Sequence, residues 1–317
     1  MESTIRLGIS RCLLGEHVRY DGGHKLDHFL RDALGRYAEY IPVCPEVECG
    51  LGVPREAMRL VGDPASPRLR TIKGGVDLTE RMQTFAAQRV DELAGLNLCG
   101  FVFKSGSPSS GMERVKVYPE GGGMAALKGV GLFAAAYMAR FPCIPVEENG
   151  RLNDPDLREN FIERVFVMHR WRQLQAEGLT LGKLVEFHSR LKLLVMAHSN
   201  KHYTELGRLV AHGKDHPLPE LADRYLSLVM EALRLKATVK KNVNVLAHVM
   251  GYFKRQLTAD EKQELLEVLD AYARELVPLI VPVTLLNHYV RKYGQDYLAT
   301  QVYLHPHPAE LKLRNHA

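Results

Sequence analysis

The chain has 317 residues, of which 46% are hydrophobic and 25% are charged. This composition is typical of a folded globular protein and excludes a largely disordered chain, and the length favours two domains with separate cores. No apolar run is long enough to span a bilayer, and the first residues lack the apolar core of a signal peptide. We therefore expect a cytoplasmic protein that has no membrane partner.

The formal net charge of +5 lies entirely in the second half of the chain. Residues 1–150 hold 18 basic and 18 acidic side chains, whereas residues 151–317 hold 24 and 19. An excess of Lys and Arg is compatible with a polyanionic partner such as a nucleic acid, and equally with an ordinary solvated helical surface.

The first half alternates short apolar runs with helical windows. In chain order we expect a strand at 5–10, a helix at 26–37, a strand at 40–44, a helix at 79–96, a strand at 100–104, a helix at 124–140 and a strand at 143–146. The connections at 50–76 and 105–123 are rich in Gly and Pro, and their length indicates functional loops. This alternation predicts an α/β domain over residues 1–150 with a mainly parallel sheet.

The second half has the 3.6-residue period of helices throughout. Helices are expected to begin at Pro155 and to cover 181–198, 200–212, 218–236, 240–256, 259–276 and 283–304. Thr258 and Glu261 have the spacing of a capping box. Residues 151–317 are therefore predicted to form an all-α domain.

The positions of the five cysteines suggest where a site lies. Ligands of a parallel sheet bind beyond the carboxyl ends of the strands. Cys12 follows the first predicted strand, and Cys44 and Cys49 follow the second, so these three are expected to meet at that edge. Cys99 and Cys143 precede strands and belong at the opposite edge. The loop after the third strand, residues 104–111, enters the same edge as the first three cysteines.

Three thiolates without a paired Cys-x-x-Cys do not make a standard structural zinc site. They suit an iron–sulfur cluster held by three cysteines, with one iron left open for a substrate atom. The alternative is that Cys12 and Cys44 are buried residues at strand ends. Glu46 is positioned to carry a proton or to be an exposed loop carboxylate. The loop side chains Lys104, Ser109 and Ser110 are expected to bind a polarised substrate.

Several ordered motifs give the chain a resemblance to known families. Cys-Leu-Leu-Gly at 12–15, Val-Arg-Tyr-Asp-Gly at 18–22, Val-Cys-Pro-Glu-Val at 43–47 and Ser-Pro-Ser at 107–109 resemble the DUF523 family of thiouracil desulfidases. Arg-Glu-Asn-Phe at 158–161, Met-Ala-His-Ser at 196–199, Gly-Tyr-Phe-Lys at 251–254 and Pro-His-Pro at 306–308 resemble the DUF1722 family. The fused arrangement is similar to desulfidases that act on 4-thiouridine in tRNA.

The resemblance implies a [4Fe–4S] cluster and removal of sulfur from thiolated uracil without net redox change, with Glu46 and Ser107 moving the protons. It also implies a cysteine in the third loop as a cluster ligand, where this chain has Ser110. Because Cys49 is predicted to lie at the same edge, the expected ligand set is Cys12, Cys44 and Cys49.

The helical half is expected to bind tRNA, with Lys236, Lys240, Lys241, Lys254 and Arg255 as the contact residues. Free thiouracil or thiouridine is the alternative substrate. Two other functions stay open, a zinc- or thiol-dependent hydrolase and a non-catalytic tRNA-binding protein that has lost the cluster. The sequence predicts no oligomeric state.

Overall fold

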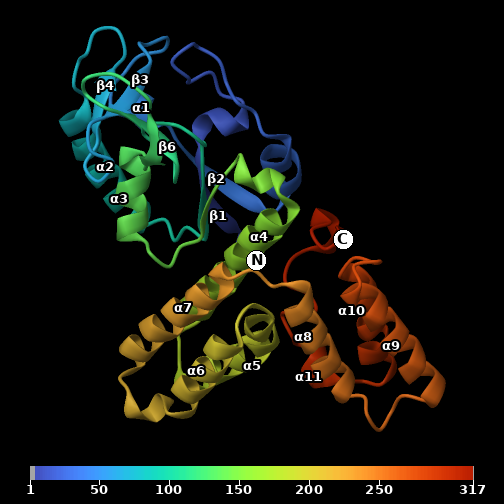
Figure 1. The fold of residues 1–317 in the computed structure, drawn as a ribbon. Coiled ribbons are helices and arrows are strands. Elements are labelled where there is room, and N and C mark those ends of the chain that lie inside the picture. The colour runs from blue at the N-terminus through green and yellow to red at the C-terminus, as the bar shows by residue number, and fades with distance from the viewer. Residues whose placement is uncertain (1–3, 317) are drawn as a thin grey trace. The chain divides into compact units, whose positions relative to one another are not determined.

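The computed structural model describes residues 4–316 (Figure 1). Their contacts divide the chain into two compact units, one ending at Asp154 and one beginning at Pro155. The first is an α/β unit and the second is helical, as the sequence predicts.

The first unit is built on a four-stranded parallel sheet in the order β2-β1-β5-β8. These strands are β1 (Ile5–Ser10), β2 (Ala38–Val43), β5 (Gly100–Phe103) and β8 (Val146–Glu148). All four residues of β5 are buried, as expected for a strand covered on both faces. Helices α2 (Thr79–Ala94) and α3 (Leu132–Arg140) pack together against this sheet around Phe101, Phe133 and Tyr137.

A second sheet occupies the two stretches that were predicted to be loops, 50–76 and 105–123, and the start of the predicted helix at 124–140. Its order is β4-β3-β6-β7, with β3 and β6 parallel and the two outer pairs antiparallel. The strands are β3 (Met58–Val61), β4 (Arg68–Thr71), β6 (Val115–Tyr118) and β7 (Ala126–Gly129). Its core of Leu60, Leu69 and Val117 packs on Met82 of α2, so the long connections are themselves structured.

Two predicted helices of the first unit are wrong in part. Residues 126–129 of the window 124–140 form β7, because pairing with β6 outweighs the helix propensity of the alanines. A Cβ on Gly129 would lie 2.5 Å from Val117 Cγ2, so only glycine allows this close pairing. The window 26–37 forms a π-helical turn, Phe29–Ala33, and a 3₁₀ turn, Leu34–Arg36, instead of a regular helix.

The second unit consists of helices whose bounds largely match the predicted ones. They are α4 (Pro155–Ala176), α5 (Leu181–His198), α6 (Asn200–Ala211), α7 (Leu218–Arg234), α8 (Val239–Gly251), α9 (Ala259–Ala273), α10 (Ile280–Lys292) and α11 (Asp296–Ala299). The capping box of Thr258 and Glu261 is confirmed. The predicted helix at 283–304 ends at Lys292, because Gly294 has a positive φ of 60° that a helix cannot contain. Within residues 4–316, every helix is too short or too polar to cross a bilayer.

An aromatic cluster joins α4, α5 and α7 in the core of the second unit. Trp171, the one tryptophan of the chain, stacks on Tyr225 with ring centroids 5.8 Å apart, and Phe187 contacts both rings. His188 Nδ1 lies 3.3 Å from the Tyr225 hydroxyl. Burial, together with the charge of Lys192, lowers the pKa of His188 to about 4. This histidine is therefore neutral in the folded protein at neutral pH.

We expect the second unit to lose stability as the pH falls from about 6.5 to 4. In that range the unfolded chain binds a proton at His188 and the folded chain does not, so His188 alone lowers the free energy of unfolding by about 2 kcal/mol between pH 7 and pH 5. His307, whose pKa burial also lowers to about 4, adds to this loss. Urea titrations followed by Trp171 fluorescence measure this loss. The variant His188→Gln should lose clearly less stability over the same interval, and an equal loss would contradict the assignment.

Candidate active site

A cavity of about 430 Å³ lies beyond the carboxyl ends of β1, β2 and β5 in the first unit. Its wall is formed by the segments that follow those strands, residues 10–12, 43–46, 104–108 and 110. Cys12, Cys44 and the third loop are thus brought together at the edge that topology predicts. Cys99 and Cys143 do not line this cavity.

The two cysteines of the cavity are held by tight local structure. Cys12 lies in a 3₁₀ turn, Arg11–Leu14, that ends at Gly15 with a φ of 94°. Cys44 is the N-cap of the short helix α1 (Pro45–Glu48), and its backbone N–H donates to Glu48 Oε1 at 2.7 Å. Both side chains are more than nine-tenths buried. The sulfur atoms are therefore presented from fixed backbone positions.

Burial makes both thiols weak acids. It raises the pKa of Cys12, against the opposing effect of the Lys104 ammonium, and it raises the pKa of Cys44 to about 12 with help from the charge of Glu46. A thiolate at either position therefore needs a positive charge nearby to stabilise it. For two cysteines that face one cavity, a bound metal ion is the usual source of that charge.

Glu46 is the centre of a hydrogen-bond network at the cavity wall. Its Oε1 accepts from Ser109 Oγ at 2.6 Å and from Ser107 Oγ at 3.4 Å. Its Oε2 accepts from Cys44 Sγ at 3.5 Å and lies 3.9 Å from Arg55 Nη2. Glu46 and Ser107 face the cavity and are linked to each other, which is the arrangement that proton transfer between substrate and protein requires.

The third loop is packed so closely that its side chains have little freedom. A Cβ on Gly131, the N-cap of α3, would lie 2.4 Å from the backbone of Ser109, and one on Gly111 would lie 2.8 Å from the Ser107 carbonyl oxygen. The carbonyl of Ser109 accepts from Phe133 N–H at 2.9 Å, which ties the loop to α3. Ser110 faces the cavity. Ser109 is fully buried behind the cavity wall, and its hydroxyl holds the Glu46 carboxylate by a hydrogen bond.

Cys49 does not face the cavity, contrary to the prediction. The turn of α1 separates it from Cys44, and its side chain packs beside the core of the second sheet. Its Sγ donates to the Glu46 carbonyl oxygen at 3.3 Å, and its own carbonyl accepts from Arg81 Nε at 2.7 Å. Position beyond a strand end is therefore not sufficient to bring a side chain into the site.

Lys104 lines the cavity, and burial lowers its pKa. Its ammonium donates to the Ser105 carbonyl oxygen at 2.7 Å. Sequence reasoning missed four further cationic residues of the wall: Arg11, Arg19, Lys25 and Arg55. Arg55 donates to the carbonyls of Val18 and Gly52, and it comes from a stretch that was expected to be an irregular loop. With Lys104 they give the cavity a positive wall beside Glu46.

Two of the five predicted contact residues of the second unit, Lys236 and Lys241, are occupied by internal contacts. Lys236 pairs with Asp156 at 2.9 Å, and Lys241 donates to the carbonyls of His198 and Lys236. Lys240, Lys254 and Arg255 are exposed and form no ion pair among residues 4–316. Three of the five predicted contact residues are therefore available to a partner.

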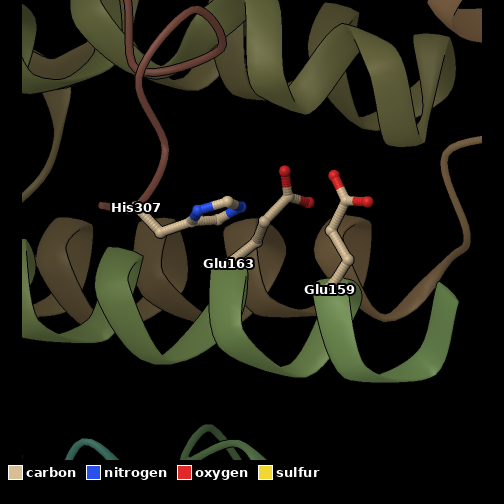
Figure 2. A group of neighbouring side chains, drawn as sticks. All are labelled: Glu159, Glu163 and His307. Atoms are coloured by element: carbon tan, nitrogen blue, oxygen red, sulfur yellow. The ribbon is translucent and has the colours of Figure 1, made fainter. Parts of the chain in front are cut away.

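Figure 2 shows a group of potential metal ligands in the second unit, Glu159, Glu163 and His307, whose ligand atoms lie within 4.8 Å of one another. The Arg314 guanidinium already binds both carboxylates, with 3.0 Å to Glu159 and 2.8 Å to Glu163. Burial, and then the neighbouring charge of Glu163, raises the pKa of Glu159 to about 8. This is a buried ion-pair network in which a guanidinium takes the place of a metal ion.

The donor set of the first-unit cavity fits part of an iron–sulfur centre. Thiolates are the protein ligands of such clusters, and two cysteines face one cavity from separate loops. Cys12 and Cys44 therefore suit an iron–sulfur group as two of its protein ligands.

Two family models match the chain, one in each unit. Residues 7–149 match the 2-thiouracil desulfurase family, and residues 192–308 match a protein family of unknown function, DUF1722. The uncharacterized protein YbgA of Escherichia coli (strain K12) is 35% identical over 153 residues, which are 48% of this chain and 90% of that protein. A solved structure titled [4Fe–4S]-dependent thiouracil desulfidase TudS is 29% identical, with a TM-score of 0.39 over 48% of this chain and 95% of that chain.

The fold and the cavity define a two-domain protein in which an α/β unit carries the candidate active site. The chain belongs to the family of YbgA-like proteins and joins a 2-thiouracil desulfurase domain to a DUF1722 domain.

Proposed function

We propose that the first unit removes sulfur from a thiolated uracil, with 4-thiouridine in tRNA as the principal substrate. In this reaction water supplies the oxygen that replaces sulfur, so a thiocarbonyl and water give a carbonyl and hydrogen sulfide, with no net oxidation or reduction. The observation that carries the proposal is the cavity itself. It joins two buried cysteines to the Glu46 network in a domain of the desulfurase family.

The chain's own residues supply binding and proton transfer. A bound iron–sulfur cluster would supply a Lewis-acidic iron for the thiocarbonyl sulfur. Glu46 accepts a proton from the attacking water, and Ser107, which is hydrogen-bonded to Glu46, passes a proton to the departing sulfur. The second water proton follows as the carbonyl forms, so that sulfur leaves as hydrogen sulfide. Ser109 holds Glu46 in place, and Lys104 lies on the wall where negative charge develops on the base.

The substrate class is tested by comparing free 4-thiouridine with thiolated tRNA under anaerobic conditions, using the loss of thiouracil absorbance. We expect a kcat/KM for tRNA at least tenfold above that for the nucleoside, because the second unit adds binding energy. Equal values would contradict the preference for tRNA and assign no role in substrate binding to the second unit.

An aromatic and basic face of the second unit supports tRNA as the partner. Tyr252 at the end of α8 is 37% exposed and stacks on Tyr297 of α11, with ring centroids 5.3 Å apart. Lys192 lies over the Tyr297 ring at 5.1 Å, and Lys254 and Arg255 follow Tyr252 in the chain. A stacked pair of rings of which Tyr252 is exposed, flanked by cations, is suited to an unstacked base and its phosphates.

Substitutions on this face should weaken tRNA binding. Tyr252→Ala removes a stacking surface and should reduce affinity by about tenfold, the low end of the energy of one base–aromatic contact. The double variant Lys254→Gln/Arg255→Gln should lower the slope of log K against log salt by about two. Fluorescence anisotropy with unmodified tRNA measures both effects. Lys262→Gln, an exposed lysine of α9, is the matched control, and equal behaviour of all variants would contradict the assignment.

A further inference from the structure

The active-site cavity receives a donor side chain from each of three loops, and one of the three is not a cysteine. Cys12 and Cys44 offer sulfur, whereas the third loop offers the hydroxyl of Ser110. We propose that Ser110 Oγ, and not the sulfur of Cys49, is the third protein ligand of the iron–sulfur group, which then has two thiolate ligands and one alkoxide. This inference rests on the proposed function, since it concerns the same site.

Ser110 is held where a ligand is needed. It lines the cavity with only 3% of its surface exposed, and its hydroxyl forms a hydrogen bond with Ser109 Oγ at 3.3 Å. The backbone N–H of Ser110 donates to Ser107 Oγ at 3.2 Å, and the close approach of Gly131 leaves the loop no room to shift. Ser110 thus offers a fixed oxygen donor in the same cavity as the sulfur atoms of Cys12 and Cys44.

Cys49 is held away from the cavity by contacts that ligation would break. To reach the wall its sulfur would have to leave the Glu46 carbonyl and the core of the second sheet. The segment is also anchored by Arg81, which donates to the Cys49 carbonyl. Unwinding α1 would displace Glu46 as well, because Glu46 lies in that helix. Ligation by Cys49 and the Glu46 network are therefore incompatible.

An oxygen ligand changes how firmly the metal is held. On binding, the Ser110 hydroxyl releases its proton to solvent and the oxygen forms a bond to iron, with no change in oxidation state. Thiolates are the softer ligands and the better match to iron in these clusters. We therefore expect the native protein to bind its cluster and to release iron to a chelator faster than a variant with three cysteines.

Anaerobic reconstitution of the full-length chain tests the ligand set without an activity assay. Iron and acid-labile sulfide are measured for the native protein and for Ser110→Cys, Ser110→Ala and Cys49→Ala. We expect about four iron atoms per chain in the native protein and in Cys49→Ala. Ser110→Ala should retain less than half of that amount. Ser110→Cys should show stronger thiolate-to-iron charge-transfer absorption and at least fivefold slower loss of iron to a chelator.

The outcomes separate the ligand assignment from the function. Loss of iron in Cys49→Ala with full iron in Ser110→Ala would overturn the inference and leave the proposed function intact. An unchanged charge-transfer band in Ser110→Cys would also overturn it. Absence of iron from every protein, including Ser110→Cys, would overturn the cluster-dependent function itself. Circular dichroism of each apo-protein shows whether a variant has folded.

Discussion

Replacement of Glu46 by Gln is expected to lower kcat for desulfuration by about 10² to 10⁴-fold, the usual contribution of a positioned acid–base group. The amide retains the size of the side chain and can still accept from Ser109 and Ser107, but it cannot take a proton from water. Anaerobic turnover of 4-thiouridine measures the effect, and iron content measured on the same samples should not change.

Glu92→Gln is the matched control for this prediction. Glu92 is a surface carboxylate of α2 that pairs with Arg89, and its replacement should leave kcat within about twofold. Full activity of Glu46→Gln would show that Glu46 does not transfer a proton in the reaction. Loss of both iron and activity would show instead that Glu46 supports the structure of the site.

Replacement of Arg314 by Met is expected to reduce the free energy of unfolding of the second unit by about 3–5 kcal/mol. The substitution leaves Glu159 and Glu163 buried side by side without the guanidinium that binds them. Arg314 also donates to the Tyr303 carbonyl at 2.7 Å, and this bond is lost too. Because Trp171 is the chain's one tryptophan and lies in the second unit, its fluorescence during urea unfolding reports on this unit alone.

A combined variant separates the charge effect from general damage. Arg314→Met with Glu159→Gln and Glu163→Gln removes both buried carboxyl groups together with the guanidinium, and should recover at least half of the lost stability. An additive loss in the combined variant would mean that the three residues do not act as one network. In that case, binding of a metal ion by Glu159, Glu163 and His307 would have to be considered again.

The helical unit was the more predictable part of the chain. Its helices have a clear apolar period and local start signals, such as Thr180 and Ser199, whose side chains cap α5 and α6. The second sheet was missed because its strands have four residues each and lie between Gly and Pro. The parallel partner of β3 is β6, more than 50 residues away, and no local pattern indicates such a pairing.

The candidate site was predictable as far as strand topology determines it. Cys12, Cys44 and Ser110 follow strand ends and meet in one cavity. Cys49 does not join them, because a single turn of helix reverses the direction of its side chain within five residues. The partners of Lys236 and Lys241 could not be predicted from the sequence either, because Asp156 and His198 lie 80 and 43 residues away. Tertiary contacts of this kind determine which charged side chains are available to a partner.

The most direct test of the central claim is mass spectrometry of the product formed in water labelled with ¹⁸O. Anaerobically reconstituted protein is mixed with tRNA that carries 4-thiouridine, and uridine and sulfide are quantified together. The account predicts uridine that carries one labelled oxygen, released in equal amounts with sulfide. Unchanged 4-thiouridine, or sulfur lost without incorporation of labelled oxygen, would contradict hydrolytic desulfuration by this site.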